Sequence, residues 1–329
     1  METLVITMNP EEPEDDKIAI AADIIKKGGL VAFATETVYG LGADALNQEA
    51  VRKLFEVKQR PSENPLIIHV ARKEQIYEVV EVNETAEKLI EEFFPGPIAL
   101  IMNKKDIVPD EVSAGLEKVA VRMPDNKVAL KLIQMSSPLA APSANITGRS
   151  SPNTTEHVLE DLEGKIEAVI DSGETKMGIE STVVDTTVEP VEILRPGPIT
   201  PEMIEKVVGE TVLGEAVSGE YTHYSPRTEL MVVTGNPDKV KDKISQLVVE
   251  YHDKGQKVGI IAVEEPETGA DYFTAVDDDE SFAKKLFSTI RDYDKKEVDV
   301  IIVEGVEERG MGYAIMNRLR KATGRVFVV

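Results

Sequence analysis

The sequence predicts an α/β fold arranged in two domains, and three observations lead to this prediction. Short apolar runs bounded by turns alternate with segments of helical periodicity, as in residues 30–70. The chain has 329 residues, of which 42% are hydrophobic, and it is longer than the usual domain of about 100–200 residues. A stretch containing glycine, serine and tyrosine, residues 217–227, breaks the periodicity. We therefore expect a first domain at 1–208, a linker at 209–228 and a second domain at 229–329.

The first domain is expected to contain strands and capped helices. Apolar runs predict strands at residues 30–34, 66–70, 98–102, 119–122, 181–185 and 191–195. Asn47 and Asn83 are expected to begin helices, because an Asn side chain accepts hydrogen bonds from the free amides of a first turn. Thr200 followed by Pro201 indicates a further helix start, since proline is favoured at the first helical position.

The second domain has the pattern of a compact βαβ unit. Its apolar runs predict strands at 229–233, 257–263 and 298–303. A helix opened by Asn236 and Pro237 is expected after the first strand, and a long helix from about Asp279 before the third. A final helix and strand complete a domain of the type that builds parallel sheets.

The composition excludes several classes of protein. The chain has no cysteine, which removes disulfides, thiolate catalysis and cysteine-based metal sites, and suits a reducing compartment. The formal net charge is −23, and −18 of it lies before Glu229, so polyanions are repelled. The N-terminal segment has no basic start, and no run of about 18 apolar residues occurs. We expect a cytoplasmic protein without membrane contact or a broad nucleic-acid surface.

The first cluster of interest is TETVYGLGADA at residues 35–45, directly after a predicted strand. Gly40, Gly42 and Ala45 fit a loose dinucleotide-binding pattern, in which glycines let backbone amides approach a pyrophosphate. A plain glycine turn between a strand and a helix explains the same residues. The polar run at 35–37 is more informative, because open α/β sheets bind ligands at the carboxyl ends of their strands.

The second cluster is KQRPSENPLIIHV at residues 58–70. Lys58 and Arg60 fall at the end of a predicted helix, and prolines fix the loop that follows. Two cations on a rigid loop can hold a triphosphate, the arginine through its planar fork and the lysine as a point charge. The alternative is a helix C-terminus whose basic residues face the helix dipole. His69, on the next strand, is either a ligand or a packed strand residue.

The third cluster combines Arg122, at the end of a strand, with the loop AAPSANITGRSSPN at residues 140–153. Ser143 and Asn145 offer neutral donors and acceptors for an amino acid or an adenine, and Ser151 can reach a phosphate. An ordinary Ser/Asn/Pro loop is the alternative. No G-x-S-x-G motif surrounds Ser143, so a serine hydrolase is disfavoured.

The fourth cluster is GIESTVVD followed by LRPG, with Ser181 at the start of one predicted strand and Arg195 at the end of the next. A surface arginine at a turn is the simplest interpretation of Arg195 alone. Lys58, Arg60, Arg122 and Arg195, however, all fall at or beside an element end, next to small polar residues, within a strongly acidic region. Four such coincidences favour a single anion-binding site.

The order and spacing of six motifs resemble those of the YrdC/Sua-type threonylcarbamoyl-AMP synthases. These motifs are TETVYGLGADA, KQRPSENPLIIHV, VRMP, APSANITGRSSP, GIESTVVD and ILRPG. The resemblance covers roughly residues 10–208 and is highly specific. The remainder, including GMGYAIMNRLRKAT at 310–323, resembles the C-terminal domain of the family's two-domain form.

The resemblance implies a fold and a reaction. The expected fold is a twisted open mixed sheet with a deep cleft, followed by a smaller Rossmann-like α/β domain. The expected reaction joins L-threonine, bicarbonate and ATP into threonylcarbamoyl-adenylate and releases pyrophosphate, with Mg²⁺ on the triphosphate and no metal held by the protein. The product is expected to pass to a tRNA threonylcarbamoyl transferase, and direct contact with tRNA to be weak or indirect.

The resemblance also assigns roles to residues of this chain. Those expected to hold the phosphates are Lys58, Arg60 and Arg195. Those expected to complete the nucleotide site are Ser62, Asn64, Asn145 and Ser151, with Tyr224 of the linker folding over ATP. Those expected to surround threonine are Thr35, His69, Ser143, Ser181 and Arg122, the last by a bidentate contact with the carboxylate. Two positions depart from the family: Ala34 replaces a proline and Ala99 a hydroxyl residue, changes expected to affect only loop rigidity.

Three other functions compete with this hypothesis. Carbamoyl-transfer proteins contain a related domain, but they also carry zinc fingers, which require cysteines that this chain lacks. A non-catalytic RNA-binding module is disfavoured by the charge of −18 in the first 228 residues and by the lack of a basic stripe. An NAD-dependent dehydrogenase rests only on the loose glycine pattern.

Overall fold

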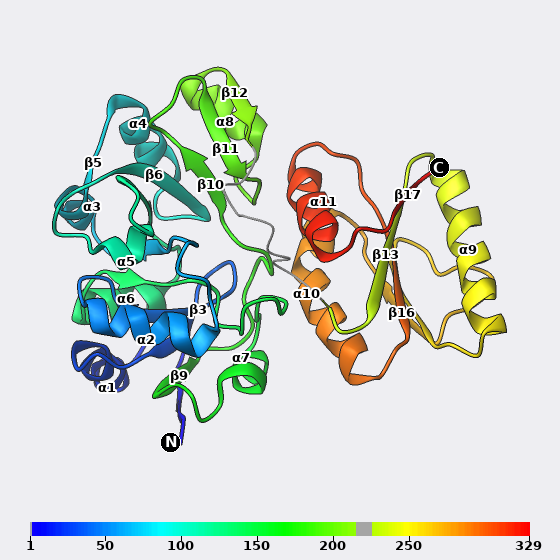
Figure 1. The fold of residues 1–329 in the computed structure, drawn as a ribbon, viewed down its shortest axis with the longest axis horizontal. Coiled ribbons are helices and arrows are strands. Elements are labelled where there is room, and N and C mark those ends of the chain that lie inside the picture. The colour runs from blue at the N-terminus through cyan, green and yellow to red at the C-terminus, as the bar shows by residue number, and fades with distance from the viewer. Residues whose placement is uncertain (1, 215–225) are drawn as a thin grey trace. The chain divides into compact units, whose positions relative to one another are not determined.

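The computed structural model describes residues 2–214 and 226–329, so the prediction for Tyr224 lies outside the described residues. The chain divides into two compact units (Figure 1). The first comprises Met1–Thr147 and Ser151–Ser218, and the second comprises Gly148–Ser150 and Gly219–Val329. Each unit has its own sheet.

The first unit consists of a mixed sheet with helices between its strands. Its strands are β1 (Leu4–Thr7), β2 (Val31–Ala34), β3 (Tyr39–Asp44), β4 (Ile67–His69), β5 (Val80–Glu81), β6 (Ile98–Lys104), β7 (Lys118–Arg122), β8 (Leu139–Ala140), β9 (Ala168–Asp171), β10 (Thr182–Asp185), β11 (Val191–Arg195) and β12 (Thr211–Leu213). Its helices are α1 (Asp15–Lys26), α2 (Gln48–Lys58), α3 (Lys73–Val79), α4 (Glu84–Phe93), α5 (Asp110–Ser113), α6 (Lys127–Met135), α7 (Thr155–Leu162) and α8 (Pro201–Val208).

The strands of the first unit join into one sheet. Over the described residues it has twelve strands in the order β1-β9-β2-β3-β8-β4-β7-β6-β10-β11-β12, with β5 paired to β6. The sheet contains parallel pairs, such as β4 with β7, and antiparallel pairs, such as β6 with β7, which confirms the predicted mixed sheet. Strand β12 pairs with β11, so the sheet extends into the range 209–228 that the sequence assigns to a linker.

The core of this unit lies on both faces of the sheet. In β2, Val31 and Phe33 pack in the cluster that contains α1 and α6, whereas Ala32 and Ala34 belong to the cluster that contains α2 and α4. Successive side chains of a strand point to opposite faces, and a strand covered on both faces is apolar throughout. Full burial of one such large side chain stabilises the fold by about 1.5–3 kcal/mol.

The predicted helix starts agree with the structure. Asn47 caps α2 by accepting hydrogen bonds from two amides of the first turn, and Asn83 caps α4 by accepting one from the Ala86 amide. Thr200 is the N-cap of α8, and Pro201 is its first residue. The capping rules therefore located these helices within a residue of their observed starts.

The glycine pattern of the first cluster has a different role from the one considered above. Gly40 and Gly42 lie inside β3, which pairs antiparallel with β2, and they do not form a loop at a helix start. A Cβ added to Gly42 would lie 2.9 Å from Phe33 Cε1 and 3.1 Å from Leu139 Cδ1. Close packing explains this glycine, so the dinucleotide-binding interpretation is wrong.

The second unit is a parallel sheet covered by helices. Its strands are β13 (Glu229–Thr234), β14 (Val258–Ala262), β15 (Tyr272–Ala275), β16 (Val300–Glu304) and β17 (Val326–Val328), and its helices are α9 (Pro237–Asp253), α10 (Asp279–Lys295) and α11 (Met311–Ala322). In the described residues the strand order is β15-β14-β16-β13-β17, with all pairs parallel. Helix α9 covers one face, and α10 and α11 cover the other (Figure 1). This is the predicted Rossmann-like α/β arrangement.

None of the helices in the described ranges, 2–214 and 226–329, is both long enough and apolar enough to cross a membrane.

Candidate active site

Three of the predicted site residues are the last residues of strands that point the same way. His69 ends β4, Arg122 ends β7 and Arg195 ends β11. His69 and Arg122 are direct neighbours in the parallel pairing of β4 with β7. Counting across β6 and β10, β11 also runs in the direction of β7. The sheet therefore brings the ends of these three strands to one edge.

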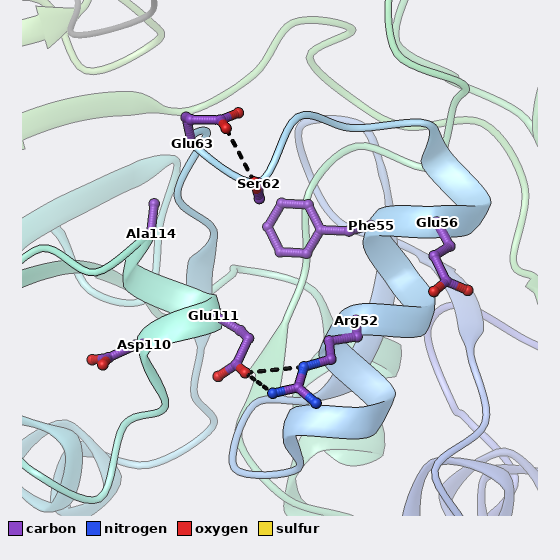
Figure 2. Close-up of a pocket in the computed structure, with 8 residues that line it drawn as sticks. All are labelled: Arg52, Phe55, Glu56, Ser62, Glu63, Asp110, Glu111 and Ala114. Carbon is purple, nitrogen blue, oxygen red and sulfur yellow. Dashed lines mark hydrogen bonds and ion pairs between the residues drawn. The ribbon is translucent and has the colours of Figure 1, made fainter.

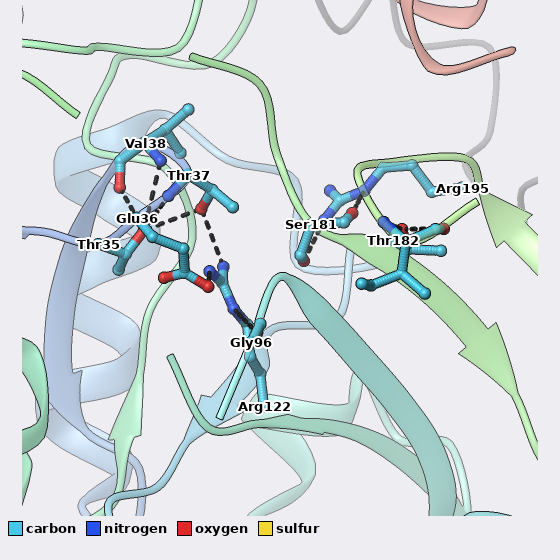
Figure 3. A network of polar contacts seen from close by, with 10 residues as sticks. Thr35, Glu36, Thr37, Val38, Gly96, Arg122, Ser181, Thr182 and Arg195 are labelled. Atoms are coloured by element: carbon cyan, nitrogen blue, oxygen red, sulfur yellow. Dashed lines mark hydrogen bonds and ion pairs between the residues drawn. The ribbon is translucent and has the colours of Figure 1, made fainter. Parts of the chain in front are cut away.

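Arg122 is held through all three nitrogens of its guanidinium group (Figure 3). Nη1 donates to the Thr37 hydroxyl at 3.0 Å, and Nε donates to the Gly96 carbonyl at 3.3 Å. Nη2 lies 2.6 Å from Oε1 of Glu36, and the two side chains are only 5% and 2% exposed. The guanidinium group is thus fixed in a buried, polar setting.

The segment 35–38 forms a tight turn around the Thr35 hydroxyl (Figure 3). This hydroxyl donates to the Val38 carbonyl at 2.7 Å and accepts from the backbone amides of Thr37 and Val38. The amide of Met177 donates to the Glu36 carbonyl at 2.9 Å, and the amide of Gly178 donates to the carbonyl of Thr37. The motif that begins with Thr35 is therefore fixed to the segment before Ser181.

Arg195 and Ser181, predicted for phosphate and for threonine respectively, are in direct contact. The Nε atom of Arg195 donates to the Ser181 carbonyl at 2.9 Å, and Nη2 donates to the Ser181 hydroxyl at 3.1 Å. The neighbouring Thr182 hydroxyl donates to the Ile199 carbonyl at 2.7 Å, which ties the turn after β11 to the start of β10. Figure 3 shows this pair in the same view as Arg122.

Lys58 joins the second motif to the third. Its side chain is 1% exposed, and Nζ donates to the backbone carbonyls of Ser143 and Asn145. The amide of Thr147 donates back to the Lys58 carbonyl at 2.9 Å. Burial lowers the pKa of Lys58 well below its ordinary value, and the nearby charge of Arg60 adds to this effect. Ser143 also pairs with Gly40 of β3, so the loop is fixed from two sides.

Arg60 lies along its own loop. Its Nε donates to the Asn64 carbonyl at 3.1 Å, and its Nη2 donates to the Pro65 carbonyl at 3.0 Å. Asn64 is 5% exposed, and among the described residues its side-chain nitrogen has no hydrogen-bond partner. Ser62 is exposed and donates to the Glu63 carboxylate at 3.2 Å. The loop is therefore ordered by its own contacts.

Ser151 is buried and contacts a residue that the sequence argument did not consider. Its hydroxyl donates to the carboxylate of Glu180, the residue before Ser181. The exposed fractions of Ser151 and Glu180 are 1% and 6%. This contact places the loop of the third motif beside the fourth motif.

A cavity of about 510 Å³ lies between α2 and α5, and among the predicted site residues only Ser62 lines it (Figure 2). Four carboxylate residues surround it, and its one basic residue, Arg52, is bound to Glu111. A triphosphate is repelled by such a wall. This cavity is therefore not the place expected to bind the phosphates, which is assigned to the cationic residues described above.

His69 is held neutral by its surroundings. Burial, with a further contribution from the positive charge of Arg122, lowers the pKa of His69 to about 3, although the contact with the Ile67 carbonyl opposes the shift. The imidazole therefore carries no charge at neutral pH and can serve as a hydrogen-bonding group beside Arg122.

We expect His69 to make the protein sensitive to acid. The unfolded chain binds a proton near pH 6.5, whereas the folded chain does so only near pH 3. The stabilising contribution of neutral His69 is thus complete above pH 6.5 and is lost as the pH falls toward 3, by about 3 kcal/mol at pH 4.5. Urea unfolding of wild type and His69→Asn at pH 7 and pH 4.5 measures this. The variant should lose about 3 kcal/mol less between the two pH values, and equal losses contradict the prediction.

Some residues of the network were absent from the sequence prediction. Glu36 and Thr37 hold Arg122, and Glu180 binds Ser151. The polar run at 35–37 indicated a site, but a single sequence does not reveal which distant residue a buried carboxylate meets. Glu180 stands within the fourth motif, where only its neighbour Ser181 was selected.

Comparison with known proteins supplies a family for these motifs. A family model described as telomere recombination, for Sua5, YciO and YrdC proteins, matches residues 23–197. This match spans more than half of the chain and includes every predicted site residue that the structure describes. The chain belongs to the Sua5/YciO/YrdC family. A second model, described as the threonylcarbamoyl-AMP synthase C-terminal domain, matches residues 199–324.

Relatives within the Sua5/YciO/YrdC family resemble the chain over nearly its whole length. The threonylcarbamoyl-AMP synthase of Pyrococcus abyssi is 48% identical and covers 98% of both chains. The threonylcarbamoyl-AMP synthase of Bacillus subtilis is 42% identical and covers 94% of both chains. The crystal structure of P. abyssi Sua5 complexed with L-threonine has a TM-score of 0.95 and 48% identity, and it covers 99% of this chain and 100% of that one.

Proposed function

We propose that the chain synthesises L-threonylcarbamoyladenylate from L-threonine, bicarbonate and ATP, with release of pyrophosphate. The amine of threonine, after losing a proton, joins bicarbonate to form a carbamate and water. An oxygen of the carbamate then attacks the α-phosphorus of ATP, and pyrophosphate leaves. The protein is thus a nucleotidyltransferase whose product is a mixed carboxylic–phosphoric anhydride.

The observation that carries this proposal is the match over nearly the whole chain to synthases named for this product. The alignment with the P. abyssi synthase covers 98% of the chain. The structure of P. abyssi Sua5, which matches this chain with a TM-score of 0.95, was solved in complex with L-threonine. The proposal is also compatible with the absence of cysteine from the sequence, because the reaction needs no thiolate nucleophile. Nucleotidyl transfer depends on positioning and on charge stabilisation more than on a covalent nucleophile.

The phosphates are assigned to Lys58, Arg60 and Arg195. A pentavalent transition state gathers negative charge on the α-phosphate and the leaving pyrophosphate, and fixed cations stabilise that charge. Lys58 is buried beside the carbonyls of Ser143 and Asn145. A bound triphosphate offers its ammonium group stronger acceptors than two neutral carbonyls. Binding of ATP is therefore expected to oppose the lowering of the Lys58 pKa.

The rest of the nucleotide site is assigned to neutral polar residues, namely Ser62, Asn64, Asn145 and Ser151. Asn64 supports this assignment, because its buried side-chain amide has no partner among the described residues. Tyr224 is proposed to contact ATP as well and lies outside the described residues. The described residues contain no group of three or more His, Asp or Glu side chains placed to hold a metal ion. Mg²⁺ is proposed to enter with ATP, because this ion is usually bound by substrate phosphates and retained water molecules.

Threonine is assigned to Thr35, His69, Arg122, Ser143 and Ser181. The carboxylate of the amino acid pairs with Arg122, the cation fixed at the end of β7. His69 is the neighbour of Arg122 in the sheet and is neutral, so it can bond a hydroxyl or an amine without competing for the carboxylate. The hydrogen bond from Arg195 to Ser181 supports a threonine site that adjoins the proposed phosphate site.

The product suggests its own partner and compartment. A carbamoyl-adenylate hydrolyses readily, so we propose that it passes to a tRNA threonylcarbamoyl transferase in the cytoplasm. The net charge of −23 opposes direct binding of tRNA by this chain.

Pyrophosphate release from ATP and Mg²⁺ tests the proposal. The release is expected only when both L-threonine and bicarbonate are present, and the nucleotide product should have the mass of threonylcarbamoyl-adenylate. Omission of each co-substrate in turn is the control. Pyrophosphate release that does not depend on threonine, or a nucleotide product with another mass, contradicts the proposed reaction even if ATP binds.

A further inference from the structure

Glu36 is a buried carboxylate to which the proposed reaction assigns no role. Its side chain is 2% exposed, and Oε1 lies 2.6 Å from Nη2 of Arg122. Neither carboxylate oxygen makes another hydrogen bond among the described residues. The charge of Glu36 is therefore directed at Arg122.

Within residues 2–214 and 226–329, Glu36 is the charged partner that Arg122 contacts. The remaining two contacts of Arg122 are the Thr37 hydroxyl and the Gly96 carbonyl, which are both neutral. A buried cation that loses its anion is strongly disfavoured, and the side chain then turns toward other acceptors or toward water. Glu36 is thus the group that makes the buried position of Arg122 favourable.

Backbone contacts hold the Glu36 carboxylate and the Arg122 guanidinium in place. The turn around the Thr35 hydroxyl sets the backbone at Glu36, and the amide of Met177 binds the Glu36 carbonyl at 2.9 Å. Gly96 holds Arg122 from the turn before β6. These contacts together determine a single orientation of the guanidinium group, and Figure 3 shows those made by residues 35–38 and by Gly96.

We propose that Glu36 is a positioning residue for the amino-acid substrate, because it holds the Arg122 guanidinium in the orientation that receives the carboxylate of threonine. The oxygens of Glu36 have almost no accessible surface, so Glu36 acts through Arg122 and does not contact the substrate. The inference rests on the proposed function, which assigns Arg122 to threonine. A purely structural role predicts lower stability with unchanged affinity for threonine.

Glu36→Gln tests the inference because glutamine keeps the shape of the side chain and removes its charge. We expect the KM for L-threonine to rise at least about tenfold, while kcat and the KM for ATP change less than about threefold. Calorimetric binding of L-threonine should weaken in parallel. An unchanged KM for threonine in a folded variant overturns the inference.

Asp185→Asn is the matched control. Asp185 is also a buried carboxylate in an ion pair, 3.1 Å from Nζ of Lys118, and it lies at the end of β10 that is remote from Ser181. Its loss should lower the melting temperature without changing the KM for threonine. If both variants raise this KM equally, general destabilisation explains the effect and the inference fails.

A double-mutant cycle with Arg122→Ala shows whether Glu36 acts through Arg122 or independently of it. If Glu36 acts only through Arg122, then Glu36→Gln should change threonine binding less than about twofold once Arg122 is alanine. A full additional loss of threonine binding in the Arg122→Ala background contradicts the inference.

If Glu36→Gln does not fold, Glu36→Asp replaces it, because aspartate keeps the charge on a shorter side chain. The effect on the KM for threonine is then compared with the effect on the KM for ATP, as for Glu36→Gln. Wild-type protein without threonine-dependent turnover or binding refutes the proposed function together with this inference, whereas active wild type with an unaffected Glu36→Gln refutes the inference alone.

Discussion

Replacement of Lys58 by alanine is expected to reduce pyrophosphate release at least about 100-fold, the magnitude typical for removal of one group that stabilises transition-state charge. Lys58 is buried at the end of α2, and its ammonium group binds the carbonyls of Ser143 and Asn145. The substitution removes a fixed cation assigned to the phosphates and also frees the loop that carries two further site residues. Both effects lower turnover and act on the same step.

Lys53→Ala provides the comparison for this variant. Lys53 lies on the same helix, but its side chain is 36% exposed and pairs with Glu167. This variant should keep near-normal turnover. Steady-state pyrophosphate release, together with circular dichroism to confirm folding, distinguishes the two. If folded Lys58→Ala is as active as Lys53→Ala, the phosphate assignment of Lys58 is wrong.

Gly197→Ala is expected to be the most damaging small substitution in the turn after β11. A Cβ at this position would lie 2.3 Å from the Thr182 amide nitrogen and 2.7 Å from the carbonyl carbon of Ser181. These are backbone atoms that cannot rotate away, so the two segments must separate. Overpacking of this kind costs about 1–3 kcal/mol or more. The separation also breaks the contacts of Arg195 with Ser181, so turnover should fall together with stability.

Gly324→Ala is the control for this substitution. An added Cβ at Gly324 meets no heavy atom within 4 Å. Urea unfolding of both variants gives the loss of free energy of unfolding, and pyrophosphate release gives the loss of activity. Equal stability of the two variants contradicts the close approach seen at Gly197.

The sequence predicted the regular part of the fold well, because that part depends on local chemistry. The runs at 98–102 and 191–195 are strands, and Asn47, Asn83 and Asn236 cap helices. Short strands were missed when their formation depends on distant partners. One example is β8 (Leu139–Ala140), which has two residues and exists only by pairing with β3 and β4.

The candidate site was predictable in part for the same reason. The sequence placed Arg122 and Arg195 at strand ends and His69 on a strand, and each is the last residue of its strand in the structure. The partners of these residues were not predictable. Glu36 meets Arg122 across 86 positions of sequence, and no periodicity within either segment encodes that contact. The glycine pattern led to a wrong interpretation because glycine occurs both in ligand-binding loops and in closely packed strands. The close approach of Phe33 to Gly42, which the sequence does not reveal, distinguishes the two.

The first strand has a consequence for synthesis of the protein on the ribosome. Strand β1 forms its ladder with β9, and the nearby Thr3 hydroxyl binds the Ile166 carbonyl, 163 positions later. At about 5–20 residues per second, the N-terminal segment waits on the order of ten seconds or more before its partner is translated. Leu4 and Val5 are apolar and remain half exposed even in the finished fold. The nascent chain therefore presents an unpaired apolar β-segment for about half of the translation of these 329 residues, a period in which chaperone binding or premature pairing with other chains competes with folding.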